Sequence, residues 1–195
     1  MSKRIALLSA VAFSALALTA SVIVPAAAEE KKMMKSELSG EKTVMVGGAA
    51  MFPSKNIIQN AVNSKDHTTL VAAVKAAGLV ETLEGKGPFT VFAPTNAAFG
   101  KLPDGTVDTL VKPENKPTLT KILTYHVVAG KLEASSLTDG KKLKTVEGEE
   151  LTVKKSGDKV MIVDAKGGSS TVTIPNVNQS NGVIHVVDTV LMPAS

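Results

Sequence analysis

The sequence predicts an α+β fold, and three observations lead to this class. Apolar residues recur at helical spacing through much of the segment 57–123. From Tyr125 onward the period changes to that of strands. The helical and strand segments do not alternate as β-α-β units would require, which favours helices and sheet in separate layers.

The first helix is expected at residues 57–62, where four apolar side chains share one face. A second apolar stripe predicts a helix over residues 70–77. Gly78 follows directly, and a glycine at this position favours the left-handed conformation of a Schellman ending. Such an ending would bring Leu79 against Val74 and fix the direction in which the chain leaves the helix.

One buried strand and three further helices are expected next. The segment 88–92 is rich in β-branched and aromatic residues, which is typical of a strand with both faces buried. Thr95 and Thr106 are placed to cap two short helices, because a threonine hydroxyl can accept a hydrogen bond from a free backbone N–H group. Pro117 suits the first turn of the third helix, where its missing N–H group is not needed.

The second half of the chain predicts strands joined by hairpins. Ser156-Gly157-Asp158 is typical of a hairpin turn, and Asn181-Gly182 predicts a type I′ turn. The expected strand segments are residues 125–128, 143–146, 151–153, 159–163, 177–179 and 183–187.

The amino terminus has the pattern of a secretory signal peptide over residues 1–28. Lys3 and Arg4 precede an apolar stretch, and we expect cleavage after Ala28. The alternative is a retained anchor, because this stretch approaches the roughly 20 residues that span a bilayer. Cleavage removes two of the 22 basic residues and none of the 18 acidic ones, so the net charge falls from +4 to +2. The protein is therefore predicted to be exported, either to the periplasm or into the medium.

Residues 29–53 have no clean period and are predicted to form a flexible leader, which leaves residues 54–194 as one domain. Methionines in the leader raise the alternative of a soft-metal site, but their irregular spacing favours a leader. These methionines are Met33, Met34, Met45 and Met51.

Composition excludes several classes of function. The chain has no cysteine, which removes thiol catalysis, thiolate metal ligands and disulfides. A nearly balanced charge, no tryptophan and a single tyrosine argue against a nucleic-acid binder. No Gly-x-Ser-x-Gly or phosphate-loop pattern occurs, and we predict no enzymatic activity and no cofactor.

Three segments carry a family resemblance. They are GPFTVFAPTNAAF at residues 87–99, LTYHVV at residues 123–128 and GVIHVVDTVLMP at residues 182–193. In this order they resemble the motifs of fasciclin-type domains, in particular the single-domain fasciclin-like proteins that bacteria secrete. The resemblance implies a compact β-sandwich flanked by several short helices. It also implies adhesion or extracellular interaction, with no general catalytic activity.

The resemblance selects candidate site residues. Thr95, Asn96, His126 and His185 belong to its motifs, and structural roles are expected for them. Tyr125 and His126 are candidates for partner contact, although a junction between helix and strand favours a structural role. Many family members carry Asp where this chain has Asn96, near the central histidine. We hypothesise that His126 is neutral at pH 7 and that Asn96→Asp raises its pKa.

Two other groups of side chains bear on ligand binding. The three histidines are not paired at ligand spacing, so no metal site is predicted. Five lysines form a candidate basic patch for an anionic polymer or a lipid headgroup, although lysines on strands also prevent edge association. They are Lys141, Lys142, Lys144, Lys154 and Lys155.

The predicted function is a non-enzymatic adhesion or interaction module outside the cytoplasm that binds a surface protein or a polysaccharide. The alternative is a small-ligand or lipid binder with a groove between helices and sheet. A deep apolar pocket with a few polar groups would favour this alternative, whereas a closed core would argue against it. Nucleic acid is not expected as a partner. After cleavage of the signal peptide, no integral membrane span is expected.

Overall fold

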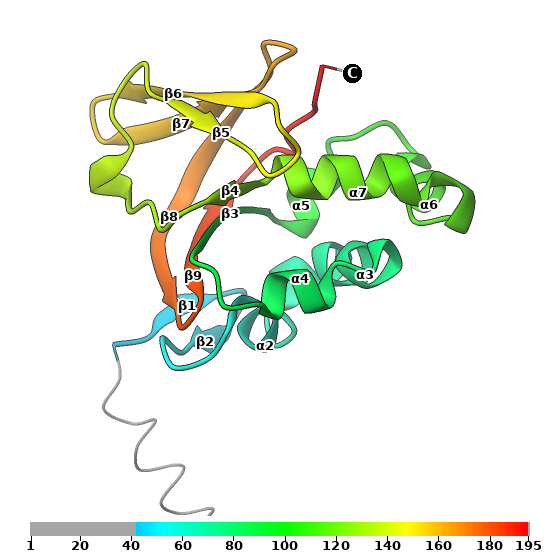
Figure 1. The fold of residues 1–195 in the computed structure, drawn as a ribbon, viewed down its shortest axis with the longest axis horizontal. Helices are drawn as coiled ribbons and strands as arrows, with labels where there is room; N and C mark the ends of the chain where they lie inside the picture. The colour runs from blue at the N-terminus through cyan, green and yellow to red at the C-terminus, as the bar shows by residue number, and fades with distance from the viewer. Residues whose placement is uncertain (1–41, 195) are drawn as a thin grey trace, which may run out of the picture. The chain divides into compact units, whose positions relative to one another are not determined.

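The computed structural model describes residues 42–194 (Figure 1). The predicted signal peptide and the first part of the predicted leader, with Met33 and Met34, lie outside these residues. The strands are β1 (Val44–Val46), β2 (Ala49–Met51), β3 (Phe89–Pro94), β4 (Val127–Ala129), β5 (Lys142–Lys144), β6 (Glu150–Ser156), β7 (Lys159–Val163), β8 (Ser169–Gln179) and β9 (Gly182–Val187). The α-helices are α2 (Ile57–Ala61), α3 (Thr68–Ala77), α4 (Val80–Glu84), α5 (Asn96–Phe99), α6 (Thr106–Leu110) and α7 (Lys116–Tyr125). Short 3₁₀ turns are η1 (Lys65–His67), η2 (Pro113–Asn115) and η3 (Ala134–Ser136).

Seven strands form one sheet in the order β4-β3-β9-β8-β7-β6-β5. Neighbours are antiparallel except β3 and β9, which run parallel from the Phe89–Gly182 pair to the Pro94–Val187 pair. A bridge between Val128 and Thr145 links the two ends of this order, so the sheet is nearly closed. Two motif segments that are far apart in the sequence are thus adjacent strands. This α+β architecture confirms the predicted fold class.

The sheet separates two apolar cores, because alternate side chains of a strand point to opposite faces. Val91 and Ile184 belong to the core beneath the helices. Phe92 and Val187 belong to a second core inside the curved sheet. Strand β3 is therefore buried on both faces, as its sequence predicts.

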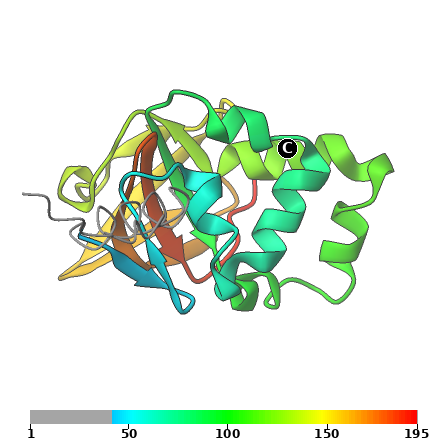
Figure 2. The same ribbon diagram turned by 90° about the horizontal axis from the view of Figure 1, so that it is seen from below.

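The helices cover one face of the sheet, and α3 and α7 pack against each other (Figures 1 and 2). Helix α3 ends as predicted at Gly78, whose φ is 73°. The N–H group of Leu79 donates to the Val74 carbonyl at 3.0 Å, which is the long bond of a Schellman motif. Pro117 lies in the first turn of α7, also as predicted.

Two predicted element boundaries are corrected. Gly105, in a left-handed conformation, precedes α6, and no side chain caps this helix, so Thr106 is its first residue and not its cap. Tyr125 is the last residue of α7, and the strand begins only at Val127. Apolar residues occur in both segments, so the change of period does not locate the junction.

The hairpin between β8 and β9 lies where the sequence predicts it, but its turn differs from the predicted type I′ turn. Gln179 pairs with Gly182, so Ser180 and Asn181 occupy the turn. Neither Asn181 nor Gly182 has the positive φ that a type I′ turn requires. A Cβ atom on Gly182 would clash with the Phe89 carbonyl, so this glycine allows the close approach of β9 to β3.

The folded domain begins earlier than predicted. Residues 44–51 form the β1–β2 hairpin, in which Val46 and Met51 are buried in the core beneath the helices. The predicted flexible leader is therefore too long at its carboxyl end. Met51 is buried while Met45 is 59% exposed, so these two thioethers do not form a common site. Three-residue strands are too short for a period to be recognised in the sequence.

Candidate functional site

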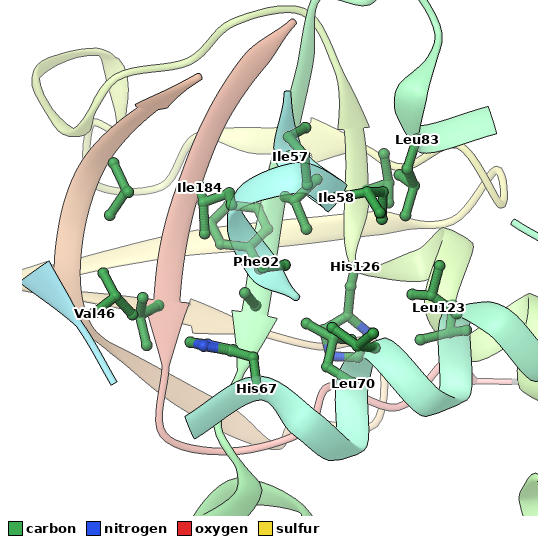
Figure 3. Close-up of a pocket in the computed structure, with 18 of the residues that line it drawn as sticks. Val46, Ile57, Ile58, His67, Leu70, Leu83, Phe92, Leu123, His126 and Ile184 are labelled. Carbon is green, nitrogen blue, oxygen red and sulfur yellow. The ribbon is translucent and has the colours of Figure 1, made fainter. Parts of the chain in front are cut away.

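An apolar cavity of about 40 Å³ lies between the helices and the sheet (Figure 3). Every side chain that lines it is buried except that of Val71, which is half-buried. His67 and His126 provide the polar groups among the lining side chains. The apolar lining labelled in Figure 3 comprises Val46, Ile57, Ile58, Leu70, Leu83, Phe92, Leu123 and Ile184.

His126 is the C-cap residue of α7, and both of its ring nitrogens have partners. The Leu191 N–H group donates to Nε2 at 2.9 Å, so Nε2 is an acceptor. Nδ1 lies 2.8 Å from the Ile122 carbonyl and must carry the proton. Burial lowers the pKa of His126 to about 4, although the Ile122 carbonyl and Asp164 act in the opposite direction. The ring is thus neutral at pH 7, as hypothesised.

His67 is held on one side only. Its Nδ1 lies 2.9 Å from Ser64 Oγ, and this hydroxyl lies 3.2 Å from the Val46 carbonyl. Within residues 42–194, Nε2 of His67 is buried and has no hydrogen-bond partner. Burial lowers the pKa of His67, although the Ala93 carbonyl and the Asp66 carboxylate act in the opposite direction. One polar atom of the apolar cavity wall is therefore unsatisfied.

His185 lies on β9 and is completely buried. Its ring stacks on Phe92 with centroids 5.7 Å apart, and its Nε2 lies 2.7 Å from the Leu132 carbonyl. Burial lowers its pKa. These contacts give His185 the structural place expected for it.

Tyr125 does not face solvent. Its exposed fraction is 0%, and that of His126 is 2%. The Tyr125 hydroxyl accepts a hydrogen bond from the Ala165 N–H group at 2.9 Å, and burial raises its pKa. This burial argues against direct contact of Tyr125 and His126 with a partner and agrees with the structural role that the sequence favours.

Thr95 and Asn96 organise the chain after β3. The Thr95 hydroxyl accepts from the Ala98 N–H group and caps α5, as predicted. Asn96 accepts from the Thr69 N–H group and donates to the Lys65 carbonyl. Asn96 therefore fastens the start of α3 and does not bond to the central histidine, which corrects the expected pairing.

We expect Asn96→Asp to leave His126 neutral at pH 7. The low pKa of His126 comes from burial, and its two nitrogens bond to Ile122 and Leu191. Histidine ring titration by NMR should give a midpoint near 4 in both proteins. A midpoint in the variant close to the ordinary value of about 6.5 would contradict this.

The five candidate lysines do not form one patch. Lys142, Lys144 and Lys154 occupy alternate, exposed positions of β5 and β6 and share the outer face of the sheet. Lys141 donates to the Ser136 carbonyl at 2.7 Å, on a loop beside the sheet. Lys155 is the next residue of β6 after Lys154, so it occupies a position of the opposite face of the sheet. The basic surface is therefore smaller than predicted.

The one serine hydroxyl that contacts a buried imidazole among the described residues is itself buried. Ser64 is the hydroxyl beside His67, but it is buried and also contacts the Val46 carbonyl. A substrate cannot reach it in this conformation. Among residues 42–194, no group of three or more His, Cys, Asp or Glu side chains is arranged to hold a metal ion. No helix in this part of the chain has the length and apolar character needed to cross a membrane.

Asn181 is the important polar residue that sequence reasoning treated only as part of a turn. Its side chain accepts from the Ile57 N–H group at 3.1 Å and donates to the carbonyls of Leu83 and Gly85 at 2.7 and 2.9 Å. It therefore joins α2, the end of α4 and the start of β9. The position of Asn181 directly before the motif that begins at Gly182 is the one sequence signal of its importance. Hydrophobic periodicity does not identify a buried polar residue of this kind.

The comparisons with known proteins agree with the motifs. The Fasciclin domain model matches residues 65–193. Protein sll1483 of Synechocystis sp. is 49% identical over 153 residues, which is 78% of this chain and 82% of the relative. The cell surface glycolipoprotein MPB83 of Mycobacterium bovis is 40% identical over 153 residues, which is 76% of this chain and 64% of the relative.

A solved structure shows the same fold. It is a FAS1 domain pair from the insect cell adhesion molecule fasciclin I, with a TM-score of 0.64 and 18% identity. The match covers 72% of this chain and 52% of that one. With the three motifs placed on β3, the end of α7 and β9, this chain belongs to the Fasciclin domain family.

Proposed function

We propose that the chain is a non-enzymatic interaction module that works outside the cytoplasm and binds a surface protein or a polysaccharide. The observation that carries this proposal is the burial of Tyr125, His126 and His185 in the core. Their chemistry serves the fold, and the domain presents its outer surface for recognition. The similar proteins include a cell surface glycolipoprotein and a cell adhesion molecule, which supports a role at a surface.

Binding to envelope material tests this proposal. Labelled full chain is added to cell envelopes of its source organism, with excess unlabelled chain as competitor. The expected result is saturable binding that the competitor removes. Protease treatment or glycosidase treatment of the envelopes then distinguishes a protein partner from a polysaccharide. Binding that never saturates, or that resists competition, would argue against a specific module.

A second candidate function rests on the unsatisfied Nε2 of His67 in the cavity wall. A cavity of about 40 Å³ cannot hold an acyl chain, since one water needs roughly 10–15 Å³. It fits a small molecule with an apolar body and one hydroxyl group. A hydroxyl group both donates and accepts, so it can bond to Nε2 in either tautomer of the ring.

Short-chain alcohols provide the probe for this cavity. Added ethanol or 1-propanol should shift the ring signals of His67 with saturation. His126 also lines the cavity, but both of its nitrogens are occupied, so its signals are the internal control for a direct bond. Equal, linear shifts of both rings would reveal a solvent effect and exclude this candidate.

A further inference from the structure

Four lysines lie on a diagonal across three adjacent strands. Residues of the same face alternate along each strand, and Lys142 and Lys144 occupy such positions on β5. Lys142 pairs with Thr152, so Lys154 lies two residues further along β6 on this face. Lys154 in turn pairs with Met161, and Lys159 lies two residues before it on β7. The lysine diagonal is Lys144, Lys142, Lys154 and Lys159.

The lysine diagonal is exposed and only weakly neutralised. All four lysines are exposed. Glu150 shares the face and contacts Lys142 at 3.2 Å, but these side chains are 51% and 68% exposed, so the pair is weak. Among the described residues, the other three lysines form no salt bridge. The positive charge of this face is therefore available to a ligand.

The acidic groups near the ends of the lysine diagonal do not cancel its positive charge. Asp158 lies in the turn before Lys159. Asp139 lies outside the strands, where its carboxylate accepts from the Lys155 N–H group at 2.8 Å. Neither carboxylate forms a salt bridge with a lysine of the diagonal among the described residues. This face of the sheet thus carries four lysine ammonium groups and one carboxylate, that of Glu150.

Strand geometry gives the spacing of the lysines. Two residues along a strand cover about 7 Å, and neighbouring strands are about 4.8 Å apart. Successive Cα atoms of the diagonal are therefore separated by about 7–8 Å, and its ends by about 22 Å. Figure 1 shows β5, β6 and β7 side by side, remote from α2 and α4. A row of charges with such regular spacing fits a linear polyanion better than a compact anion.

We propose that the lysine diagonal binds a linear acidic polysaccharide, such as a chain of uronate sugars. This inference rests on the proposed function and specifies its partner. Nucleic acid is disfavoured because Phe92 and Tyr125 are buried and offer no ring for base stacking on this face. A membrane surface is disfavoured because Val146, at 46% exposed, is the single exposed large apolar side chain beside these strands.

The test compares matched charge reversals in the full chain. Lys144→Glu with Lys154→Glu changes the diagonal, whereas Lys86→Glu with Lys112→Glu makes the same change of net charge on exposed loops elsewhere. Binding to polygalacturonate is measured at low and at physiological salt, with neutral dextran as the negative control. We expect saturable binding of the native chain that weakens with salt, an affinity loss of at least about tenfold in the diagonal variant, and little change in the control variant.

Three other outcomes would overturn this inference. Equal losses in the two variants would show a general charge effect and overturn the diagonal. Tighter binding to anionic vesicles or to single-stranded DNA than to polygalacturonate would overturn the class of partner. If envelopes bind the chain saturably but the diagonal variant binds them equally well, this inference fails while the proposed function stands. Unfolding curves confirm that the variants are folded, and Lys144→Gln with Lys154→Gln should give a smaller loss of affinity than charge reversal.

Discussion

Asn181→Ala is expected to lower the free energy of unfolding by about 3–5 kcal/mol. The Asn181 side chain is 7% exposed and makes three hydrogen bonds, to Ile57, Leu83 and Gly85. Alanine removes all three bonds, so the buried Ile57 N–H group and Leu83 carbonyl and the partly buried Gly85 carbonyl lose this partner. Each such group costs about 1–3 kcal/mol, so the combined effect exceeds that of an ordinary substitution.

Asn178→Ala is the matched control for this substitution. Asn178 lies on β8 close to the same hairpin, but its Oδ1 has no partner among the described residues. Its Nδ2 makes one long hydrogen bond, of 3.4 Å, to the Asn176 carbonyl. Chemical denaturation should therefore show a loss below about 1 kcal/mol for this variant. Equal losses for both variants would contradict the tertiary role of Asn181.

Asn181 also shows what a local interpretation of the sequence misses. The Asn-Gly pair located the hairpin correctly, because turn-forming residues separate two strand-like segments. In the structure, however, the two residues have other roles. Asn181 bonds to two helices, and Gly182 makes room for the Phe89 carbonyl. Both demands come from segments that are remote in the sequence, and turn rules contain no information about them.

Predictions succeeded where neighbouring residues determine the structure. Gly78 ends α3 through bonds within a few residues, and the composition of β3 directly reflects burial on both faces. The hairpin of residues 44–51 was missed because its stability depends on packing of Val46 and Met51 in the core. Such packing becomes visible only when the helices and β8 are placed.

The same distinction between local and tertiary determinants applies to the candidate site. The motifs identified His126 and His185 correctly as parts of the fold, but they gave the wrong neighbour for Asn96. His67 lies outside the quoted motifs, so its unsatisfied nitrogen had no signal in the sequence. Likewise, Lys159 joins the lysine diagonal through strand register, which lysine spacing alone does not reveal.

The second large effect is a loss of stability between pH 6.5 and pH 4. The pKa of His126 is lowered to about 4 by burial, whereas the ring in the unfolded chain titrates near 6.5. Above pH 6.5 both states are neutral and the domain has its full stability. As the pH falls, the unfolded chain binds a proton that the folded chain does not, which favours unfolding. At about 1.4 kcal/mol per pKa unit, the loss from His126 reaches about 3 kcal/mol by pH 4.

His67 and His185 act in the same direction, since burial lowers the pKa of each ring. Denaturation curves between pH 7 and pH 4 should therefore show that unfolding is accompanied by the uptake of more than one proton. His126→Gln removes one titrating ring, so its slope of stability against pH should fall by about one proton even though the variant is less stable throughout. A native curve that is flat from pH 6.5 to 4.5 would show that the rings titrate normally, and the closed core around them would then have to open readily to water.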